Sequence, residues 1–356
     1  MQTVVRSYSK INLGLAIGPN RPDGFHGLTT LYQTLELHDL VTVSAVRSQA
    51  TEISITSNDE RVPLDSRNTC WKMVERALAR MGLAAEVAIH IEKRLPVQGG
   101  MGAGSANAAA ALIGLEKELG TALAGGERLK LAGEVGSDVP LFLLGGSVLG
   151  LGRGEQVVPL PDMSPVFCVI AVPEVGVSTP QAFRDWDARM ERQALTESQE
   201  LDRLSELSLA FAALYAEPGT SGIIRGSSPD PHNEVSKRGG FEQAQGGHEG
   251  DLAENTLLSL VRTGVENDFE QVVFPAYPSL REIKRQLVGS SGRESGEALY
   301  AALSGSGSAL FGLYRSEADA AKAQQRVLDA GNDAGTKVLI TKTLPRSQYW
   351  TRMFAE

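Results

Sequence analysis

The chain has 356 residues, 42% hydrophobic and 22% charged, so it is long enough for two domains and can form a full core. Its net charge of −9, without a cluster of Lys and Arg, argues against nucleic acid or an anionic membrane as a main partner. No signal region, 18-residue apolar run or paired cysteines are evident, since Cys70 and Cys168 stand far apart in apolar surroundings. We therefore expect a cytoplasmic protein.

Apolar residues alternate strictly along residues 11–17, which predicts a β-strand over residues 3–17 with one buried face. Lys10 and Asn12 lie on the opposite face of this strand, so their side chains project together. A lysine in a strand is usually a solvated charge, and this interpretation is the alternative to a functional Lys10.

A turn follows the first strand, because residues 19–24 contain two prolines, an aspartate and a glycine. Phe25 and His26 come directly after it. An aromatic ring in such a place can stack on a nucleobase, which is worth roughly 1–3 kcal/mol per base. Alternatively, Phe25 anchors the loop and His26 lies at the surface. Strands are then predicted over residues 28–37, 40–46 and 52–56.

Asn68 is a candidate N-cap for a helix over residues 68–81, and Gly82 is the expected end of this helix. Val87, Ile89 and Ile91 recur at every second position between Glu86 and Glu92, which predicts a strand over residues 87–91. The apolar residues that recur at helical spacing, and that we expect to face the core, are Trp71, Val74, Leu78 and Met81.

Residues 96–107 are the most distinctive stretch, because four of the six positions 99–104 are glycines. Glycine destabilises a helix or strand interior by about 0.5–1 kcal/mol, so a loop is predicted here. Ser105 and the following alanines predict a helix N-terminus, with Gly120 as the end of that helix. Such a loop exposes backbone N–H groups at the positive end of a helix dipole and attracts phosphate. A tight turn with small-residue packing is the alternative.

Two common phosphate motifs do not fit this glycine loop. A P-loop requires a lysine after its glycines, and none follows here. A dinucleotide fingerprint requires G-x-G-x-x-G after a strand, and the glycines here are out of that register.

Asp138 follows a second predicted helix over residues 127–135, which ends at Gly136. It lies between a glycine turn and an apolar run, where burial is expected, although an Asp after a Gly is usually a helix cap. Two strands are predicted next, over residues 148–151 and 166–172, with a domain boundary near 155–165.

A further helix, predicted from residue 177, carries Phe183, which could equally be a core residue. Residues 187–250 include eight glycines and three prolines between 218 and 250. We interpret them as a helical pair carrying a mobile insertion, with no assigned chemistry. The elements predicted after them are a strand over 298–303, a glycine and serine loop over 304–312, a helix over 317–329 and a strand over 337–342. The glycine and serine loop could be a simple hairpin turn.

Four motifs resemble those of the GHMP kinases, and they occur in the order expected for that family. The motifs are Tyr8–Leu13, Pro96–Asn107, Gly136–Phe142 and Ser304–Ala309. Asp23-Gly24-Phe25-His26 is similar to an element of the branch whose substrate carries a cytidine diphosphate. Ala103 and Ala106 depart from the pattern, where the family often has Gly and Ser. The loop therefore requires a negative φ at Ala103.

The resemblance implies an α+β fold with two domains. Residues 1–160 would form an ATP-binding domain of the ribosomal protein S5 domain 2-like type, and residues 161–356 a ferredoxin-like domain with the insertion near 187–250. The active site would lie between them. The implied reaction transfers the γ-phosphate of ATP to the 2-hydroxyl of 4-diphosphocytidyl-2-C-methyl-D-erythritol, an intermediate of the non-mevalonate isoprenoid route.

The resemblance also implies roles for individual residues. Asp138 would accept the hydroxyl proton, Lys10 would orient Asp138 and steady the phosphoryl group, and Mg²⁺, whose ligands stay unassigned, would bridge phosphate oxygens. The implied ATP-binding residues are Asn68, Pro96, Val97, Gln98, Gly99, Gly100, Met101, Gly102, Ala103, Gly104, Ser105 and Ala106. The implied substrate-binding residues are Asn12, Phe25, His26, Asn107, Phe183, Ser304, Gly305, Ser306 and Gly307.

The resemblance implies that Phe25 and Phe183 enclose the base, and that His26 recognises its edge. We expect a monomer or weak homodimer that binds a small cytidine diphosphate substrate, and neither nucleic acid nor membrane. One alternative is a GHMP kinase for mevalonate, homoserine or a sugar. Another is a nucleotide-binding or regulatory protein without activity, against which the presence of both Lys10 and Asp138 argues.

Overall fold

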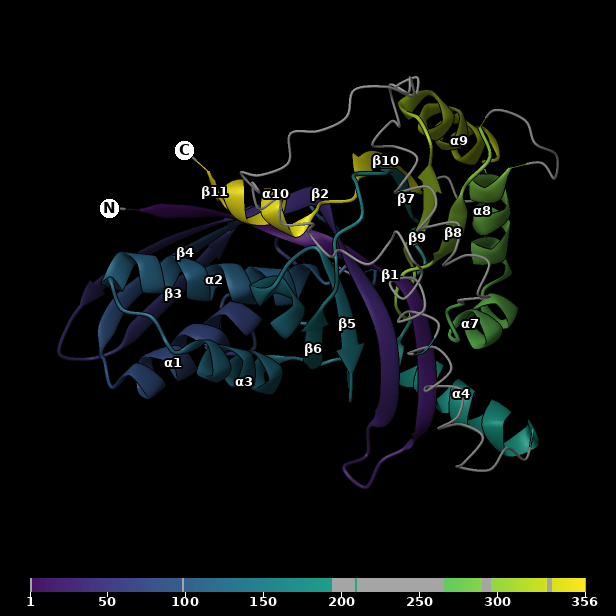
Figure 1. The fold of residues 1–356 in the computed structure, drawn as a ribbon. Helices are drawn as coiled ribbons and strands as arrows, with labels where there is room; N and C mark the ends of the chain where they lie inside the picture. The colour runs from purple at the N-terminus through teal and green to yellow at the C-terminus, as the bar shows by residue number, and fades with distance from the viewer. Residues whose placement is uncertain are drawn as a thin grey trace, which may run out of the picture.

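The computed structural model describes residues 2–97, 99–193, 209, 266–289, 296–331 and 335–355. The described strands form a seven-stranded sheet and a four-stranded sheet, and the long β1–β2 hairpin runs down between the two halves (Figure 1). Both ends of the chain lie at one edge of the first sheet, because the last strand, β11, pairs antiparallel with β1.

The first sheet has the order β11-β1-β2-β4-β3, with β5 paired to β2 and β6 paired to β5. Three helices pack with this sheet around an apolar core. The strands are β1 (Thr3–Asn20), β2 (His26–Arg47), β3 (Glu52–Ser57), β4 (Ala85–Glu92), β5 (Ser147–Leu151), β6 (Gln156–Pro159) and β11 (Phe354–Ala355). The helices are α1 (Thr69–Met81), α2 (Ala103–Leu119) and α3 (Gly125–Val135), with a short 3₁₀ turn at Pro140–Leu143.

The second sheet has the order β10-β7-β9-β8, which numbers as 4-1-3-2 along the chain. Helices α8 and α9 pack against it, and this β-α-β-β-α-β arrangement is ferredoxin-like. Its strands are β7 (Phe167–Val172), β8 (Tyr300–Leu303), β9 (Leu310–Tyr314) and β10 (Lys337–Lys342). The other helices of the second half are α4 (Thr179–Gln193), α7 (Glu270–Ala276), α8 (Pro278–Val288) and α9 (Glu317–Asp329).

The prediction of separate strands over 28–37 and 40–46 is wrong, because β2 is continuous across both. Asp39, near the predicted break, is fully buried and pairs with Lys93, and its carboxylate also accepts the backbone N–H groups of Arg94 and Leu95. A charged residue therefore remains inside the strand because every oxygen has a partner. The expectation of one buried face on the first strand is also too narrow, since both faces of β1 are buried from Ser7 to Gly18.

The helix predictions succeed at their caps, but α2, α3 and α4 each begin two residues away from the predicted start. Asn68 caps α1 by accepting the backbone N–H of Cys70 at 2.8 Å, and Gly82 ends the helix in the left-handed region. Helix α2 begins at Ala103, two residues before the predicted Ser105, because Gly102 at φ +70° already turns the chain into the helix. Gly120 ends α2 as predicted.

The core face of α1 is centred differently from the prediction. Met73, Val74 and Ala77 are fully buried, whereas Trp71 and Met81 are only partly buried at its border. Both cysteines are free and buried, as expected of reduced core residues.

The chain returns to the first sheet after β10, through α10 (Arg346–Thr351) and β11. The backbone N–H of Leu344 donates to Thr34, and that of Arg6 donates to the carbonyl of Met353. The elements that the sequence analysis missed are β6, β9, α7, α8, α10 and β11. The predicted loop over 304–312 is therefore too long, because β9 already begins at Leu310.

Two expectations about the chain's organisation remain untested or lie outside the described part. The predicted domain limits stay a prediction. The proposed helical pair and insertion lie outside the described residues, except where α4 covers 187–193 and at Leu209. Within the described ranges, no helix is long and apolar enough to cross a membrane.

Candidate active site

Lys10 on β1 and Asp138, in the turn after α3, face one another. The Lys10 ammonium is 3.2 Å from the Asp138 Oδ2 and donates to the Asn12 Oδ1 at 2.6 Å. Lys10 is only 3% exposed, whereas Asp138 is 31% exposed. A buried ammonium between two oxygens is held in one position, and its carboxylate partner remains open to an incoming group.

Tyr32 on β2 holds the other oxygen of Asp138. Its hydroxyl donates to the Asp138 Oδ1 at 3.0 Å. Burial, together with the negative charge of Asp138, raises the pKa of Tyr32 well above its usual value, so the hydroxyl keeps its proton. Asp138 is therefore fixed from both sides, by a cation and by a neutral donor.

The glycine loop reaches this pair directly. A Cβ atom at Gly102 would lie 3.1 Å from the Lys10 Cγ and 2.9 Å from the Phe142 ring, so only glycine allows this approach. No side chain in the described part of the chain caps α2, and its first turn holds no acidic residue. An uncapped helix N-terminus of this kind attracts anions, and this one lies beside Lys10. Ala103 is the first helical residue, so the departure from Gly fits the negative φ that it requires.

The glycine and serine loop of the second half packs onto the glycine loop of the first. The Ser304 hydroxyl donates to the carbonyl of Gly100 at 3.0 Å, and a side chain at Gly100 would overlap the Ser304 carbonyl oxygen. The Asn267 side chain donates to the carbonyls of Leu303 and Gly305 at 2.8 and 2.7 Å. This loop is therefore not a free hairpin turn, because it is fixed against the glycine loop that leads into α2.

A cavity of about 580 Å³ begins at these loops and extends to the β1–β2 turn and α4, and this volume suits a small-molecule ligand. Of the residues predicted for the site, the cavity is lined by Lys10, Asn12, Phe25, His26, Gly100, Asp138, Phe183, Gly305 and Ser306.

Sequence comparison identifies relatives along the whole chain. Residues 68–146 match the family model of the GHMP kinases N terminal domain, and residues 250–333 match that of GHMP kinases C terminal. A 4-diphosphocytidyl-2-C-methyl-D-erythritol kinase of Solibacter usitatus is 32% identical over 99% of this chain and 93% of its own length. The chain belongs to the 4-diphosphocytidyl-2-C-methyl-D-erythritol kinase family. The predicted GHMP kinase relationship is thereby confirmed.

Further relatives agree with this membership. A 4-diphosphocytidyl-2-C-methyl-D-erythritol kinase of Rhodococcus jostii is 43% identical over 52% of this chain and 59% of its own length. A crystal structure of 4-(cytidine 5'-diphospho)-2C-methyl-D-erythritol kinase superposes with a TM-score of 0.62 at 24% identity, covering 97% of this chain and all of the other. A homoserine kinase from Cytophaga hutchinsonii also has a TM-score of 0.62, at 20% identity and with 97% and 96% coverage. These structures share the fold, and the predicted α+β GHMP kinase fold is confirmed.

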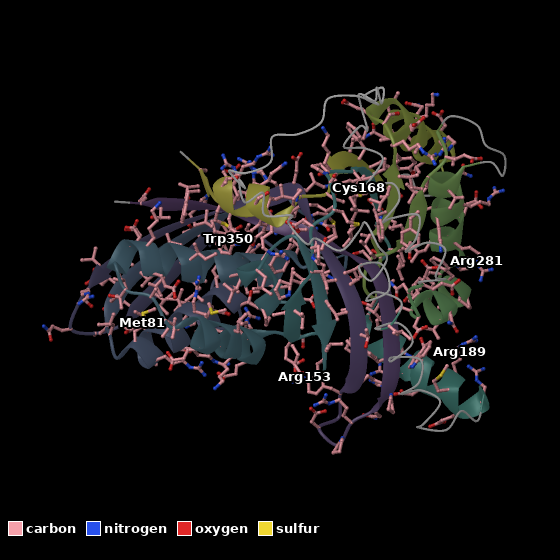
Figure 2. The ribbon with its side chains drawn as sticks, viewed as in Figure 1. Met81, Arg153, Cys168, Arg189, Arg281 and Trp350 are labelled. Atoms are coloured by element: carbon pink, nitrogen blue, oxygen red, sulfur yellow. The ribbon has the colours of Figure 1, made fainter. Side chains whose placement is uncertain are left out.

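In this member of the kinase family, the rings at the far end of the cavity are arranged differently from the expected pair. His26 stacks on Phe183 at 4.7 Å and 12°, and Phe183 meets Phe269 edge-on at 5.0 Å. Phe25 is 50% exposed and lies under the Arg153 guanidinium at 4.7 Å. Figure 2 shows Arg153 on the segment that follows β5, near the end of the β1–β2 hairpin. Phe25 and Phe183 thus line one cavity, but His26 covers a face of Phe183.

Other predicted site residues have structural partners in this kinase. Asn68, besides its cap, donates to the Pro63 carbonyl at 2.6 Å, and Asn107 accepts the Ser7 hydroxyl at 2.6 Å. Met101 and Ala106 are buried in the core. Gln98 lies outside the described residues.

The remaining predicted residues lie in or beside the two loops. Gly99, Gly100, Ser306 and Gly307 line a second hollow between the two loops. Pro96 and Val97 line a separate cavity of about 660 Å³. Gly104 and Ser105 lie in the first turn of α2, and Ser304 lies in the loop interface described above. The predicted binding roles of all these residues stay predictions.

Sequence reasoning missed Tyr32, Arg153, Thr179 and Asp187, which also line the cavity of this kinase. Tyr32 lies opposite Asn12 in the β1–β2 register, and this register is not visible in the sequence. Asp187 follows Phe183 by four residues, so the helical spacing was an available signal.

The donor groups of the site fit a Mg²⁺ ion that is held mainly by substrate phosphates. The described residues contain no group of three or more His, Cys, Asp or Glu that could hold a metal ion by themselves. Mg²⁺ in phosphotransferases is held by one or two carboxylates together with substrate phosphates. Asp138, partly exposed beside the N-terminus of α2, fits such a site.

Proposed function

We propose that this chain transfers the γ-phosphate of ATP to the 2-hydroxyl of 4-diphosphocytidyl-2-C-methyl-D-erythritol. The observation that carries the proposal is the Lys10–Asp138 pair, which adjoins the free N-terminus of α2 at one end of the cavity. Membership of the kinase family supports the same reaction.

Asp138 accepts the proton of the substrate hydroxyl as that oxygen attacks phosphorus. Tyr32 and Lys10 each bond one carboxylate oxygen, so the carboxylate cannot turn away from the cavity. Lys10 also faces the phosphate end of the cavity, where its charge offsets the charge that builds on the transferred group. Lys10 thus contacts both the general base, Asp138, and the place of the transferred phosphoryl group.

The N–H groups at the start of α2 and the loop from Gly99 to Gly102 hold the ATP phosphates. Positive φ at Gly99, Gly100 and Gly102 supports this role, because it lets backbone approach a ligand without side chains between them. Mg²⁺, when bound, neutralises charge on the phosphate oxygens, and Asp138 is the candidate protein ligand.

The rest of the cavity accommodates the cytidine diphosphate part of the substrate. Arg153 and Arg184 supply positive charge in its lining, which suits a diphosphate. Phe25, His26 and Phe183 supply aromatic faces for the base.

We also propose a monomer or weak homodimer that acts on this small molecule in the cytoplasm and binds neither nucleic acid nor membrane. Two buried, unpaired thiols, Cys70 and Cys168, suit a reducing compartment. The net charge of −9 disfavours anionic partners of large area. Sedimentation velocity at several concentrations measures the oligomeric state.

A coupled ADP-release assay tests the reaction across four acceptors: 4-diphosphocytidyl-2-C-methyl-D-erythritol, mevalonate, homoserine and galactose. We expect turnover with the first only. Turnover with one of the other three instead would identify a GHMP kinase for a small alcohol. Absence of ADP release with all four, from protein that binds ATP, would support a protein without activity.

A further inference from the structure

The imidazole of His26 is bonded to a carboxylate that the sequence analysis did not consider. The Nε2 of His26 lies 2.6 Å from the Asp187 Oδ1. The His26 side chain is 8% exposed and that of Asp187 is 40% exposed. His26 is thus nearly enclosed, and Asp187 lies at the exposed rim of the cavity.

Helix α4 fixes this imidazole in two ways. Phe183 and Asp187 are four residues apart, so they project from the same side of the helix, and both line the cavity. Phe183 stacks under the His26 ring at 4.7 Å, and Asp187 bonds its Nε2. The ring plane and one ring nitrogen are therefore both determined by one turn of α4.

A carboxylate accepts hydrogen bonds and does not donate them, so the Nε2 of His26 must carry the proton in this contact. The bond made by one ring nitrogen sets the state of the other. We propose that Asp187 is a positioning residue that holds neutral His26 in its Nε2–H tautomer, so that Nδ1 is an acceptor that selects cytosine over uracil.

The selection follows from the donors and acceptors of the two bases. Cytosine has an amino group at position 4, which can donate to an acceptor Nδ1, whereas uracil has a carbonyl oxygen there. Two facing acceptors repel and leave a polar group unpaired, which is how a polar site rejects a close analogue. This inference rests on the proposed function, because it assumes a cytidine diphosphate substrate.

A purely structural role for the pair is the alternative, since it also joins α4 to the β1–β2 hairpin. The chain offers a matched control on the same helix. Asp185 accepts from the Gln181 side chain at 2.8 Å and is not among the residues that line the cavity. Asp185→Asn removes the same charge from α4 without touching His26.

The tautomer is measured by two-bond ¹H–¹⁵N correlation NMR of protein labelled at its five histidines, with His26→Gln to assign the signal. We expect the Nε2–H tautomer in the wild type and in Asp185→Asn. Asp187→Ala should give a mixture, and Asp187→Asn should favour Nδ1–H, because its amide can donate to Nε2. A wild-type imidazolium or Nδ1–H form, or an unchanged tautomer in both Asp187 variants, would overturn the proposal.

Base selection is measured as the ratio of CDP to UDP affinity by calorimetry. We expect Asp187→Ala to lower this ratio about tenfold, Asp187→Glu to restore part of it, and Asp185→Asn to leave it unchanged. A wild-type ratio in Asp187→Ala, with the fold verified by circular dichroism, would overturn the selection. If Asp187→Ala does not fold, Asp187→Asn replaces it with the same expectation.

The two readouts separate this inference from the proposed function. Equal affinity of the wild type for CDP and UDP would contradict the cytidine substrate, and with it the selection step. The NMR result is independent of any ligand and supports or contradicts the control of His26 by Asp187 alone.

Discussion

The two ends of the cavity differ in how firmly their side chains are held. At the reaction end, Lys10, Asn12 and Tyr32 are 2–3% exposed and are linked to each other or to Asp138 by hydrogen bonds. At the base end, Phe25 is 50% exposed and Asp187 is 40% exposed. The reacting groups are thus held by buried contacts, whereas Phe25 and Asp187 lie at the exposed rim. At the base end it is His26, 8% exposed at the start of β2, that is held in place.

This difference matches what each end must do. Phosphoryl transfer gains from groups that are positioned before the reaction, since their reorganisation would raise the barrier. A base must enter and leave, and stacking tolerates small shifts of the rings. We therefore expect substitutions at the reaction end to change kcat and substitutions at the base end to change substrate affinity.

The largest expected effect is that of Asp138→Asn. The amide keeps the size of the side chain but cannot accept the hydroxyl proton, so kcat should fall by roughly 10²–10⁴. The affinity for ATP, measured by calorimetry, should stay within a few-fold. Asp185→Asn is the control for loss of a negative charge, and near-normal turnover of Asp138→Asn would remove Asp138 from the mechanism.

Phe183→Ala should have the next largest effect, and it acts on the other end. Loss of a stacking ring should weaken binding of the cytidine substrate by roughly 1–3 kcal/mol, while the KM for ATP stays unchanged. His26 also loses the ring beneath it, so its discrimination between cytidine and uridine substrates should fall as well. Phe354→Ala, a 41% exposed ring near the C-terminus, is the control. Wild-type affinity in Phe183→Ala would favour a kinase for a small alcohol.

The reaction end was the more predictable part of the site. Lys10, Asn12, Asp138 and the glycine loop lie in contiguous motifs, so their chemistry is visible in short stretches of sequence. Tyr32 was missed because its role depends on the register of β1 against β2, which places it beside Asn12.

The contacts at the base end could be found only from the structure. His26 and Asp187 are 161 positions apart, and only the packing of α4 against the hairpin brings them to 2.6 Å. The fold, too, was predictable from the sequence only where it depends on residues that are close along the chain. Caps such as Asn68 and Gly82 depend on neighbouring residues and were predicted, whereas the continuity of β2 depends on Asp39 meeting Lys93 across the sheet.

Tyr32→Phe tests whether the fixed position of Asp138 matters for kcat. Only the hydroxyl that holds the Asp138 Oδ1 is lost, so kcat should fall about tenfold with little change in either KM. Tyr314→Phe is a matched control, because its buried hydroxyl donates to the Leu287 carbonyl far from Asp138 along the chain. Equal kcat values in Tyr32→Phe and Tyr314→Phe would show that Asp138 does not need the Tyr32 hydrogen bond to keep its position.

Arg153→Ala should have a smaller effect, confined to the base end. The guanidinium stacks on Phe25, which is half exposed, and a cation–π contact at such a site is worth about 0.5–1 kcal/mol. We expect a two- to fivefold rise in KM for the cytidine substrate and an unchanged kcat. Arg153→Lys should recover part of the affinity, and a large fall in kcat would instead place Arg153 at the reaction end.

Deleting residues 220–250 should have the smallest effect and tests whether either end of the cavity needs this stretch. Its composition is rich in glycine and poor in large apolar side chains, and neither GHMP family model includes residues 187–249.

We therefore expect an unchanged kcat and a Tm within about 2 °C of the wild type, measured by calorimetry. Replacing the same residues with a Gly/Ser sequence of equal length separates the effect of length from that of sequence. If the deletion lowers Tm or kcat strongly and the replacement does so too, specific side chains of this stretch support the cavity. If only the deletion does so, the length of the connection positions Asn267, and through it the loop that packs on Gly100.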